Sequence, residues 1–226
     1  MTRNIELVRR FAPNIEGRDF VVGDIHGCFD ALCVEMDRIQ FNPAVDRMFS
    51  VGDLVDRGAQ SADAIDWIAQ PWFHSIRGNH EEMAILSAAG ALSADMYAAN
   101  GGAWFLALAP DQQKAIAQVF LTLPIVIEVS TPAGLVGLVH AEPQGLDWPR
   151  FVANVMAEDS VTLDLAVWAR TRYRAHDTRC IQGVRVVYVG HTPVAKPIEL
   201  GNVRYIDTGA VFGKSLTVVE LTAGLT

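Results

Sequence analysis

Cysteine is scarce in this sequence, and long apolar runs are absent. Only three cysteines, Cys28, Cys33 and Cys180, occur among 226 residues. They are too few and too unevenly spaced for a disulfide framework or a cysteine-ligated zinc site. No run of 18 apolar residues is present, which excludes a transmembrane helix. The opening residues MTRNIELVRRFAP lack the apolar segment of a signal peptide, so we expect a cytoplasmic protein without a membrane partner.

Positive charge is also in short supply. The chain has 18 lysines and arginines against 26 aspartates and glutamates, which gives a formal net charge of −8. Broad nucleic-acid binding needs a basic face, so we expect no nucleic-acid partner. Half of the residues are hydrophobic, which is ample for a core at this length. We expect a single domain over residues 1–226, acting as a monomer.

Apolar stretches ending in glycine turns alternate with amphipathic stretches along the chain. Strands are expected at 18–24, 47–53, 72–79, 125–130, 134–140, 184–190, 203–207 and 215–221, and helices at 28–39 and 61–70. A helical insertion is expected at about 81–123, broken at 100–102 and 110, and a helical patch near 161–172 lies in an otherwise polar segment. The initial β-α-β-α-β order predicts an α/β fold whose parallel sheet has helices outside.

Five of the predicted strands end in an aspartate, histidine or asparagine beside a tight turn. These residues are Asp24, His26, Asp53, Asn79, His140 and His191. Because the ends of parallel strands can meet at one edge of a sheet, we expect these side chains to converge. Mixed oxygen and nitrogen ligands suit manganese, iron or zinc better than calcium. Six ligands are too many for one tetrahedral ion, but they fit two metals that share a carboxylate.

Three short blocks contain most of these residues: GDIHG, GDLVDRG and GNHE, with 24 and 19 residues between them. They resemble the signature blocks of the phosphoprotein phosphatase branch of the calcineurin-like metallophosphoesterases, which includes bacteriophage and small bacterial serine/threonine phosphatases. The resemblance extends over nearly the whole chain. It implies two packed mixed β-sheets flanked by helices, an α/β/β/α sandwich.

The resemblance also implies a role for each ligand. Asp24 and His26 would hold a first metal, Asp53 would bridge both metals, and the second would be held by Asn79, His140 and His191. The expected cofactor is a pair of divalent ions, manganese foremost, with iron or zinc as alternatives. A hydroxide shared by the two metals would attack phosphorus directly, without a covalent enzyme intermediate.

Four further residues would act on the substrate in a family member. His80 would be the general acid that protonates the leaving alkoxide, and Asp56 would hydrogen-bond and orient it. Arg57 and Arg170 would bind the phosphoryl oxygens with their planar guanidinium groups. Arg172 lies close to Arg170 in VWARTRY and competes with it for this role.

Outside this set, two residues call for an interpretation of their own. Glu81 follows the third block, and we expect a helix N-terminal acid near the site rather than a metal ligand. Trp104 follows NGGA. We expect it to anchor the core or a loop, with a place in the substrate groove as the alternative.

The resulting functional hypothesis is a metal-dependent protein phosphatase acting on a phosphoprotein or phosphopeptide. Phosphoserine and phosphothreonine monoesters are the expected substrates, and phosphotyrosine and phosphohistidine remain open. The alternative is a symmetrical dinucleoside tetraphosphatase, since those enzymes share the GDIHGC opening. Their second block usually lacks the aspartate that stands here as Asp56, which favours the phosphatase. A metal-binding module without turnover is disfavoured, because neither a ligand nor His80 is missing.

Overall fold

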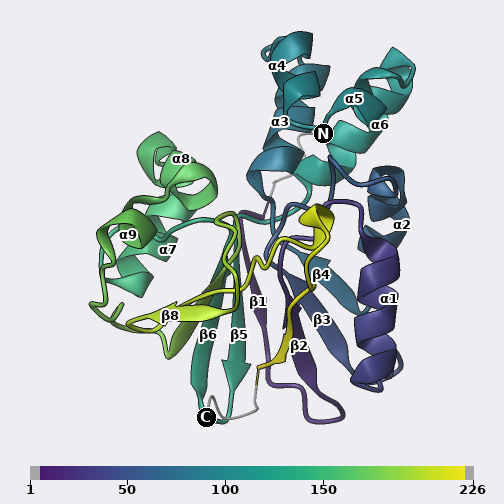
Figure 1. The fold of residues 1–226 in the computed structure, drawn as a ribbon. Coiled ribbons are helices and arrows are strands. Elements are labelled where there is room, and N and C mark those ends of the chain that lie inside the picture. Colours follow the sequence, from purple (N-terminus) through teal and green to yellow (C-terminus); the bar gives the residue numbers. More distant parts are fainter. Residues whose placement is uncertain (1–5, 222–226) are drawn as a thin grey trace.

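Two β-sheets pack face to face in the computed structural model, which describes residues 6–221 (Figure 1). The strands are β1 (Val8–Phe11), β2 (Asp19–Val22), β3 (Arg47–Ser50), β4 (Phe73–Ser75), β5 (Val126–Thr131), β6 (Gly134–Val139), β7 (Val186–Val189), β8 (Ile198–Leu200), β9 (Val203–Tyr205) and β10 (Val218–Glu220). One sheet has six strands in the order β1-β5-β6-β7-β9-β8, and the other has four in the order β10-β2-β3-β4. The neighbours β2, β3 and β4 are parallel, as are β6, β7 and β9.

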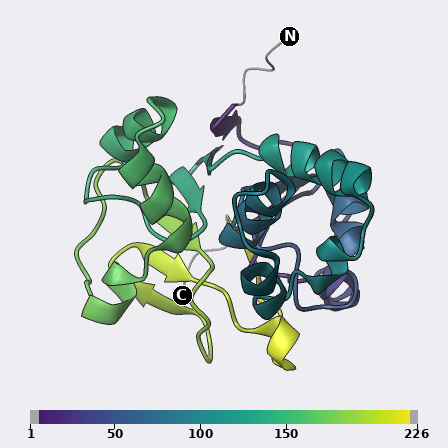
Figure 2. The ribbon, with the colours of Figure 1, turned by 90° about the horizontal axis from the view of Figure 1, so that it is seen from above.

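Helices cover the outer face of each sheet. They are α1 (Phe29–Arg38), α2 (Ala64–Ile68), α3 (Asn79–Ala88), α4 (Ala94–Ala99), α5 (Ala103–Leu106), α6 (Pro110–Leu121), α7 (Trp148–Met156), α8 (Ser160–Trp168) and α9 (Thr171–Ala175), with short 3-10 helices at Ser61–Asp63 and Ala210–Phe212. Seen from above, the green group α7–α9 and the blue to teal group α1–α6 lie on opposite sides of the molecule (Figure 2). Among residues 6–221, no helix has both the length and the apolar character needed to cross a bilayer.

The buried apolar residues form three layers that follow this arrangement. The layer between the sheets contains Val21 and Phe49 from one sheet and Ile127, Leu138 and Tyr188 from the other, all fully buried. A second layer lies between the six-stranded sheet and α7 and α8, and a third between the four-stranded sheet and α1–α6. This arrangement confirms the predicted α/β/β/α sandwich.

The structure corrects several element predictions. It adds β1, β8 and α7, none of which was predicted. Strand β1 contains two arginines and β8 has three residues, so neither carries a clear apolar alternation. Helix α7 contains Pro149, which is tolerated because it lies in the first turn. The predicted strands are shorter than expected, because pairing stops before the glycine turns. Helices α3–α6 occupy the segment for which a helical insertion was predicted, and they stand above the sheets (Figure 1).

Candidate active site

The predicted ligands lie at strand ends that meet at one edge of the two sheets. Asp24 and His26 follow β2, Asp53 follows β3, Asn79 follows β4, His140 follows β6, and His191 follows β7. All six side chains are buried, with exposed fractions between 0% and 6%. Backbone contacts join the strand ends, since the amides of Ile25 and His26 both donate to the carbonyl of Asp53 at 3.1 and 2.8 Å.

Glycines in the blocks allow this close approach. A Cβ atom at Gly52 would lie 2.6 Å from the backbone nitrogen of Gly78, so only glycine lets the second and third blocks touch. Gly52 also has a φ of +92°, which side chains rarely tolerate. Gly190, which precedes His191, packs its Cα directly against the Asp24 carboxylate. Glycine therefore decides how near the ligands come to one another.

The site also holds strained backbone. Eight non-glycine residues among those described have a positive φ, and five of them are predicted site residues. These are His26, Asp53, Asp56, Arg57 and His191, with φ between +47° and +70°. Such conformations cost about 1–3 kcal/mol each and persist where the surrounding structure enforces them, typically at functional sites.

Two groups of potential ligand atoms share one carboxylate, and one of them includes His80, the predicted general acid. Atoms of Asp53, His140 and His191 lie within 4.8 Å of one another, and so do atoms of His26, Asp53 and His80. Asp53 therefore lies where a single carboxylate can serve two cations. Whether these residues fit metal ions is decided by the protons that their nitrogens carry.

Each of the three histidines among the predicted ligands presents one ring nitrogen to a backbone carbonyl. His26 Nδ1 lies 2.8 Å from Val55 O, His140 Nδ1 2.6 Å from Val51 O, and His191 Nε2 3.1 Å from Trp168 O. A carbonyl oxygen only accepts, so these nitrogens carry the proton in a neutral ring. The opposite nitrogen then presents a lone pair, which is the form that binds a metal.

These lone pairs face other acceptors. His26 Nε2 lies 3.5 Å from Asp53 Oδ2, and His140 Nε2 lies 3.3 Å from Asp53 Oδ1. The Asn79 Oδ1 atom lies 2.9 Å from His140 Nε2 and 2.8 Å from His191 Nδ1. Lone pairs that face a carboxylate repel it unless a positive charge lies between them. The residues present therefore fit divalent cations.

The pKa shifts of the predicted ligands also indicate that this cluster favours a positive charge. Burial lowers the pKa of His26 and of His191 to about 3, so both rings stay neutral. At His140 burial also acts to lower the pKa, but the Asp53 carboxylate outweighs it and raises the pKa. Burial first, and then the carboxylates of Asp207 and Asp53, raise the pKa of Asp24 well above its ordinary value.

Asp207 is a site carboxylate that the sequence reasoning missed. It follows β9, is 3% exposed, and its Oδ1 accepts a hydrogen bond from the Gly209 amide at 2.9 Å. A Cβ atom at Gly23 would lie 3.4 Å from its Cα, which places it beside the Asp24 strand end. The sequence YIDTG places Asp207 at the end of the predicted strand 203–207. The strand-end pattern that identified the other site residues would therefore have identified Asp207 as well.

His80 and Asp56 form a buried pair. His80 Nδ1 lies 2.7 Å from Asp56 Oδ2, and the side chains are 1% and 0% exposed. His80 Nε2 lies 3.9 Å from Asp53 Oδ2. The other oxygen of Asp56 accepts hydrogen bonds from the Tyr97 hydroxyl at 3.1 Å and the Trp104 indole at 2.7 Å. Tyr97 was not singled out from the sequence, and Trp104 has this hydrogen bond in addition to its packing.

Glu81 lies in the first turn of α3 and connects the second and third blocks. Its Oε2 accepts from the backbone amides of Gly78 at 2.8 Å and Asp53 at 3.0 Å, and its Oε1 from that of Leu54 at 2.8 Å. Burial and then the Asp53 carboxylate raise the pKa of Glu81 to about 7. The expectation of a helix N-terminal acid near the site is confirmed.

Two arginines contact the ligand cluster from different segments. Arg57 is exposed, and its Nη1 lies 2.5 Å from His26 Nε2. Its guanidinium also lies 5.8 Å from the centre of the exposed Phe212 ring. Arg170, just before α9, donates from Nη2 to the backbone carbonyl of His191 at 2.9 Å. Both predicted phosphate-binding residues therefore lie beside the ligands.

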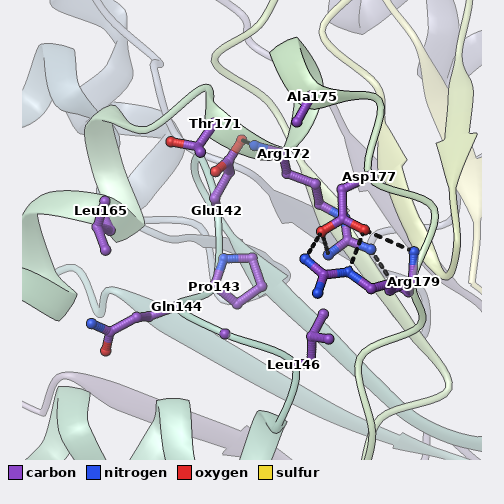
Figure 3. A pocket seen from close by; sticks show the side chains of 11 residues that line it. Glu142, Pro143, Gln144, Leu146, Leu165, Thr171, Arg172, Ala175, Asp177 and Arg179 are labelled. Carbon is purple, nitrogen blue, oxygen red and sulfur yellow. Dashed lines mark hydrogen bonds and ion pairs between the residues drawn. The ribbon is translucent and has the colours of Figure 1, made fainter.

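Arg172, the competitor of Arg170, points elsewhere. Its side chain turns toward Asp177 and Arg179 at a cavity of about 370 Å³ (Figure 3). It donates to the carbonyl oxygens of Arg179 and Leu200, and its Nη1 lies 3.9 Å from Asp177 Oδ2. Since Arg172 is 93% buried among these partners, with an exposed fraction of 7%, the geometry favours Arg170 for contact with a phosphoryl group.

Comparison with known proteins identifies the family of this chain. The sequence profile of the calcineurin-like phosphoesterases matches residues 20–195. The chain belongs to the calcineurin-like phosphoesterase family. Members of this family use a binuclear divalent metal centre, and this chain is accordingly a metallophosphoesterase that hydrolyses phosphoric monoesters. The resemblance expected from the three blocks is confirmed.

Relatives with assigned names fall into two groups. Serine/threonine-protein phosphatase 1 of Salmonella typhimurium is 34% identical over 98% of this chain and 100% of its own length. Serine/threonine-protein phosphatase 2 of Escherichia coli is 32% identical over 84% of this chain and 87% of its own length. A symmetrical bis(5'-nucleosyl)-tetraphosphatase of Actinobacillus pleuropneumoniae is 42% identical, but over 64 residues, which are 27% of this chain and 24% of that one.

Solved structures support the fold. A putative diadenosine tetraphosphatase superposes with a TM-score of 0.68 at 19% identity, covering 97% of this chain and 95% of its own. A cold-active protein tyrosine phosphatase superposes with a TM-score of 0.62 at 18% identity, covering 95% and 75%. At such identities the likeness concerns the fold alone.

Proposed function

We propose that this chain is a metal-dependent protein phosphatase whose substrates are phosphoserine and phosphothreonine monoesters in proteins or peptides. Phosphotyrosine and phosphohistidine are further candidates. The observation that carries the proposal is the Asp53 carboxylate shared by two histidine-containing groups, with the His80–Asp56 pair beside it. Residues 1–226 would form a single catalytic domain in which α3–α6 are an insertion.

The predicted ligands would divide between two divalent ions, of which manganese is the first candidate. Asp24 and His26 would hold one ion, and Asp53 would serve both. The other would be held by Asn79, His140 and His191. When bound, the ions lower the pKa of a water molecule and offset the charge of the phosphoryl oxygens.

The remaining residues bind the phosphoryl group and move one proton. Arg57 and Arg170 would hold phosphoryl oxygens through paired N–H donors, interactions that strengthen as charge develops. A water molecule loses one proton to solvent and its oxygen forms a bond to phosphorus while the ester P–O bond breaks, and solvent later returns a proton to His80. His80 gives its Nε2 proton to the leaving oxygen, and Asp56 holds the Nδ1 side of the ring so that Nε2 faces the substrate.

The substrate class rests on the extent of similarity. The relatives named serine/threonine-protein phosphatases align with most or all of their length. Symmetrical dinucleoside tetraphosphatase is the second candidate, favoured by 42% identity over 64 residues. Because that similarity covers 27% of the chain, it leaves most of the chain without a counterpart in the alignment.

A substrate panel tests the proposal. We expect protein saturated with Mn²⁺ to show its highest kcat/KM on a phosphoserine or phosphothreonine peptide, with lower values on phosphotyrosine and phosphohistidine peptides. Diadenosine tetraphosphate should be the poorest substrate. If diadenosine tetraphosphate were hydrolysed with the highest kcat/KM of the panel, the protein phosphatase proposal would be wrong and the second candidate would replace it.

A further inference from the structure

Two donors outside the sequence blocks converge on one oxygen of Asp56. The Tyr97 hydroxyl reaches Oδ1 at 3.1 Å, and the Trp104 indole N–H reaches the same atom at 2.7 Å. Tyr97 lies in α4 and Trp104 in α5, so both come from the helical insertion. Meanwhile Oδ2, the other oxygen, faces His80 Nδ1 at 2.7 Å.

The Asp56 carboxylate depends on these donors. It is fully buried, and among residues 6–221 it forms an ion pair with His80 but with no lysine or arginine. A buried carboxylate needs hydrogen bonds to remain ionised and fixed in orientation. Burial and then Asp56 raise the pKa of Tyr97, so the Tyr97 hydroxyl keeps its proton and can donate. Two donors on Oδ1 prevent the carboxylate from rotating and direct Oδ2 at the ring of His80.

The glycines between α4 and α5 hold this arrangement in place. The ring of Tyr97 lies directly against the Cα of Gly102, where any side chain would collide with it. A Cβ atom at Gly101 would lie 2.6 Å from the backbone nitrogen of Arg57, and the Gly101 carbonyl accepts from that same nitrogen at 3.3 Å. The NGG segment therefore packs the insertion onto the strained Asp56–Arg57 backbone.

We propose that Tyr97 and Trp104 are positioning residues for the general acid, acting through the Asp56 carboxylate that orients His80. This inference rests on the acid role of His80 in the proposed function. It gives α4 and α5 a part in catalysis, since they supply two of the three hydrogen bonds to the Asp56 carboxylate. Proton donation matters most when the leaving group is a strong base, so their loss should be felt mainly on alkyl phosphates.

The test compares two substrates in the full-length Mn²⁺-loaded protein. The leaving group of a phosphoserine peptide is a strongly basic serine alkoxide. The leaving group of p-nitrophenyl phosphate is a weakly basic phenolate, which needs little protonation. Trp104→Phe and Tyr97→Phe each remove one donor and keep an aromatic ring. We expect each to lower kcat on the peptide about 5- to 30-fold and kcat on p-nitrophenyl phosphate less than about 3-fold, with KM little changed.

Reference and control variants make the result decisive. His80→Asn should show the same selectivity with a larger loss, about 10²- to 10⁴-fold on the peptide. Trp67→Phe and Tyr205→Phe are matched controls, because Trp67 makes no indole hydrogen bond among the described residues and the buried Tyr205 hydroxyl has no partner there. Both controls should leave the two kcat values unchanged. Manganese content and thermal melting, measured for every variant, report on folding.

The outcomes separate the two proposals. If His80→Asn shows the substrate selectivity and the Tyr97 and Trp104 variants do not, the positioning role is refuted while the acid role stands. Equal losses on both substrates in Tyr97→Phe and Trp104→Phe also refute it, because they indicate a structural role. If His80→Asn itself slows both substrates equally or loses metal, the acid assignment fails, and the positioning inference fails with it.

Discussion

Replacing Glu81 with glutamine should loosen the connection between the second and third blocks. The carboxylate accepts three backbone N–H groups, two on Oε2 and one on Oε1. Glutamine keeps one acceptor oxygen and presents an NH₂ group at the other position, so at least one buried N–H loses its acceptor. That loss costs about 1–3 kcal/mol, and the change of the remaining bonds from charged to neutral adds about 1 kcal/mol.

The expected decrease in unfolding free energy is therefore about 2–4 kcal/mol. For a chain of this size it corresponds to a fall in Tm of about 4–16 °C. The Asp53 amide is one of the three donors, so the metal affinity should also fall, by about 10- to 100-fold. Differential scanning calorimetry and manganese titration at pH 8 with Mn²⁺ present measure both quantities.

Glu82→Gln is the matched control. Glu82 lies next to Glu81 in α3, but its side chain is 27% exposed and pairs with Arg77 at 3.0 Å. This partly exposed ion pair is worth at most about 1 kcal/mol. A Tm for Glu81→Gln no lower than that of Glu82→Gln, with unchanged metal affinity, would refute the role assigned to Glu81.

In the metal-free protein, the difference in stability between the wild type and Glu81→Gln should depend on pH, and the sign of this dependence follows from the pKa of Glu81. The pKa of Glu81 is raised from 4.5 to about 7 in the folded protein. The folded state then binds the Glu81 proton more tightly than the unfolded state, so the contribution of this one group to wild-type stability declines as the pH rises from 4.5 to 7. Glutamine has no such titration. The stability gap between the wild type and Glu81→Gln should therefore narrow over this range in the metal-free protein.

Three further predictions follow from the site. Arg170→Ala should raise KM and lower kcat for phosphopeptides, whereas Arg172→Ala should mainly lower Tm, as steady-state kinetics and calorimetry would show. Chelation should abolish activity and Mn²⁺ should restore it, with about two ions per chain by elemental analysis; a single tightly bound ion in active protein would contradict the shared role of Asp53. The lowered pKa of His26 and of His191 means that the unfolded state binds more protons, so the metal-free protein should lose stability as pH falls from about 6.5 toward 3, as acid unfolding monitored by circular dichroism would reveal.

The convergence of the candidate site residues could be predicted from sequence because the predicted ligands follow β-strands and adjoin glycine. In a sheet of parallel strands these positions share one edge, so a strand prediction is also a prediction of proximity. The prediction needed only the approximate end of each strand, and the residues between Asp24 and His191 could be grouped despite 167 positions of separation. Asp207 obeys the same rule after β9 and could have been included.

The contribution of the helical insertion could not be predicted in this way. The ends of parallel strands lie together in a sheet, but no such rule fixes where the residues of a helix lie. The position of Tyr97 or Trp104 relative to Asp56 therefore depends on how α4 and α5 pack. The NGG segment predicts a break between helices, but it does not predict which backbone the glycines approach. Helix α7 was missed for a related reason, since Pro149 indicates a loop unless it is known to lie in a first turn.

The contacts between the helical insertion and Asp56 and Arg57 also stabilise a strained backbone. Asp56 and Arg57 both have φ of +70°, a conformation that neither residue favours. The strain persists because the Asp56 carboxylate is held by three donors and the Arg57 amide by Gly101. The insertion therefore does more than bury apolar surface on α3. It holds a backbone that would otherwise relax in the conformation that aims the Asp56 side chain at His80 and places the Arg57 side chain beside His26.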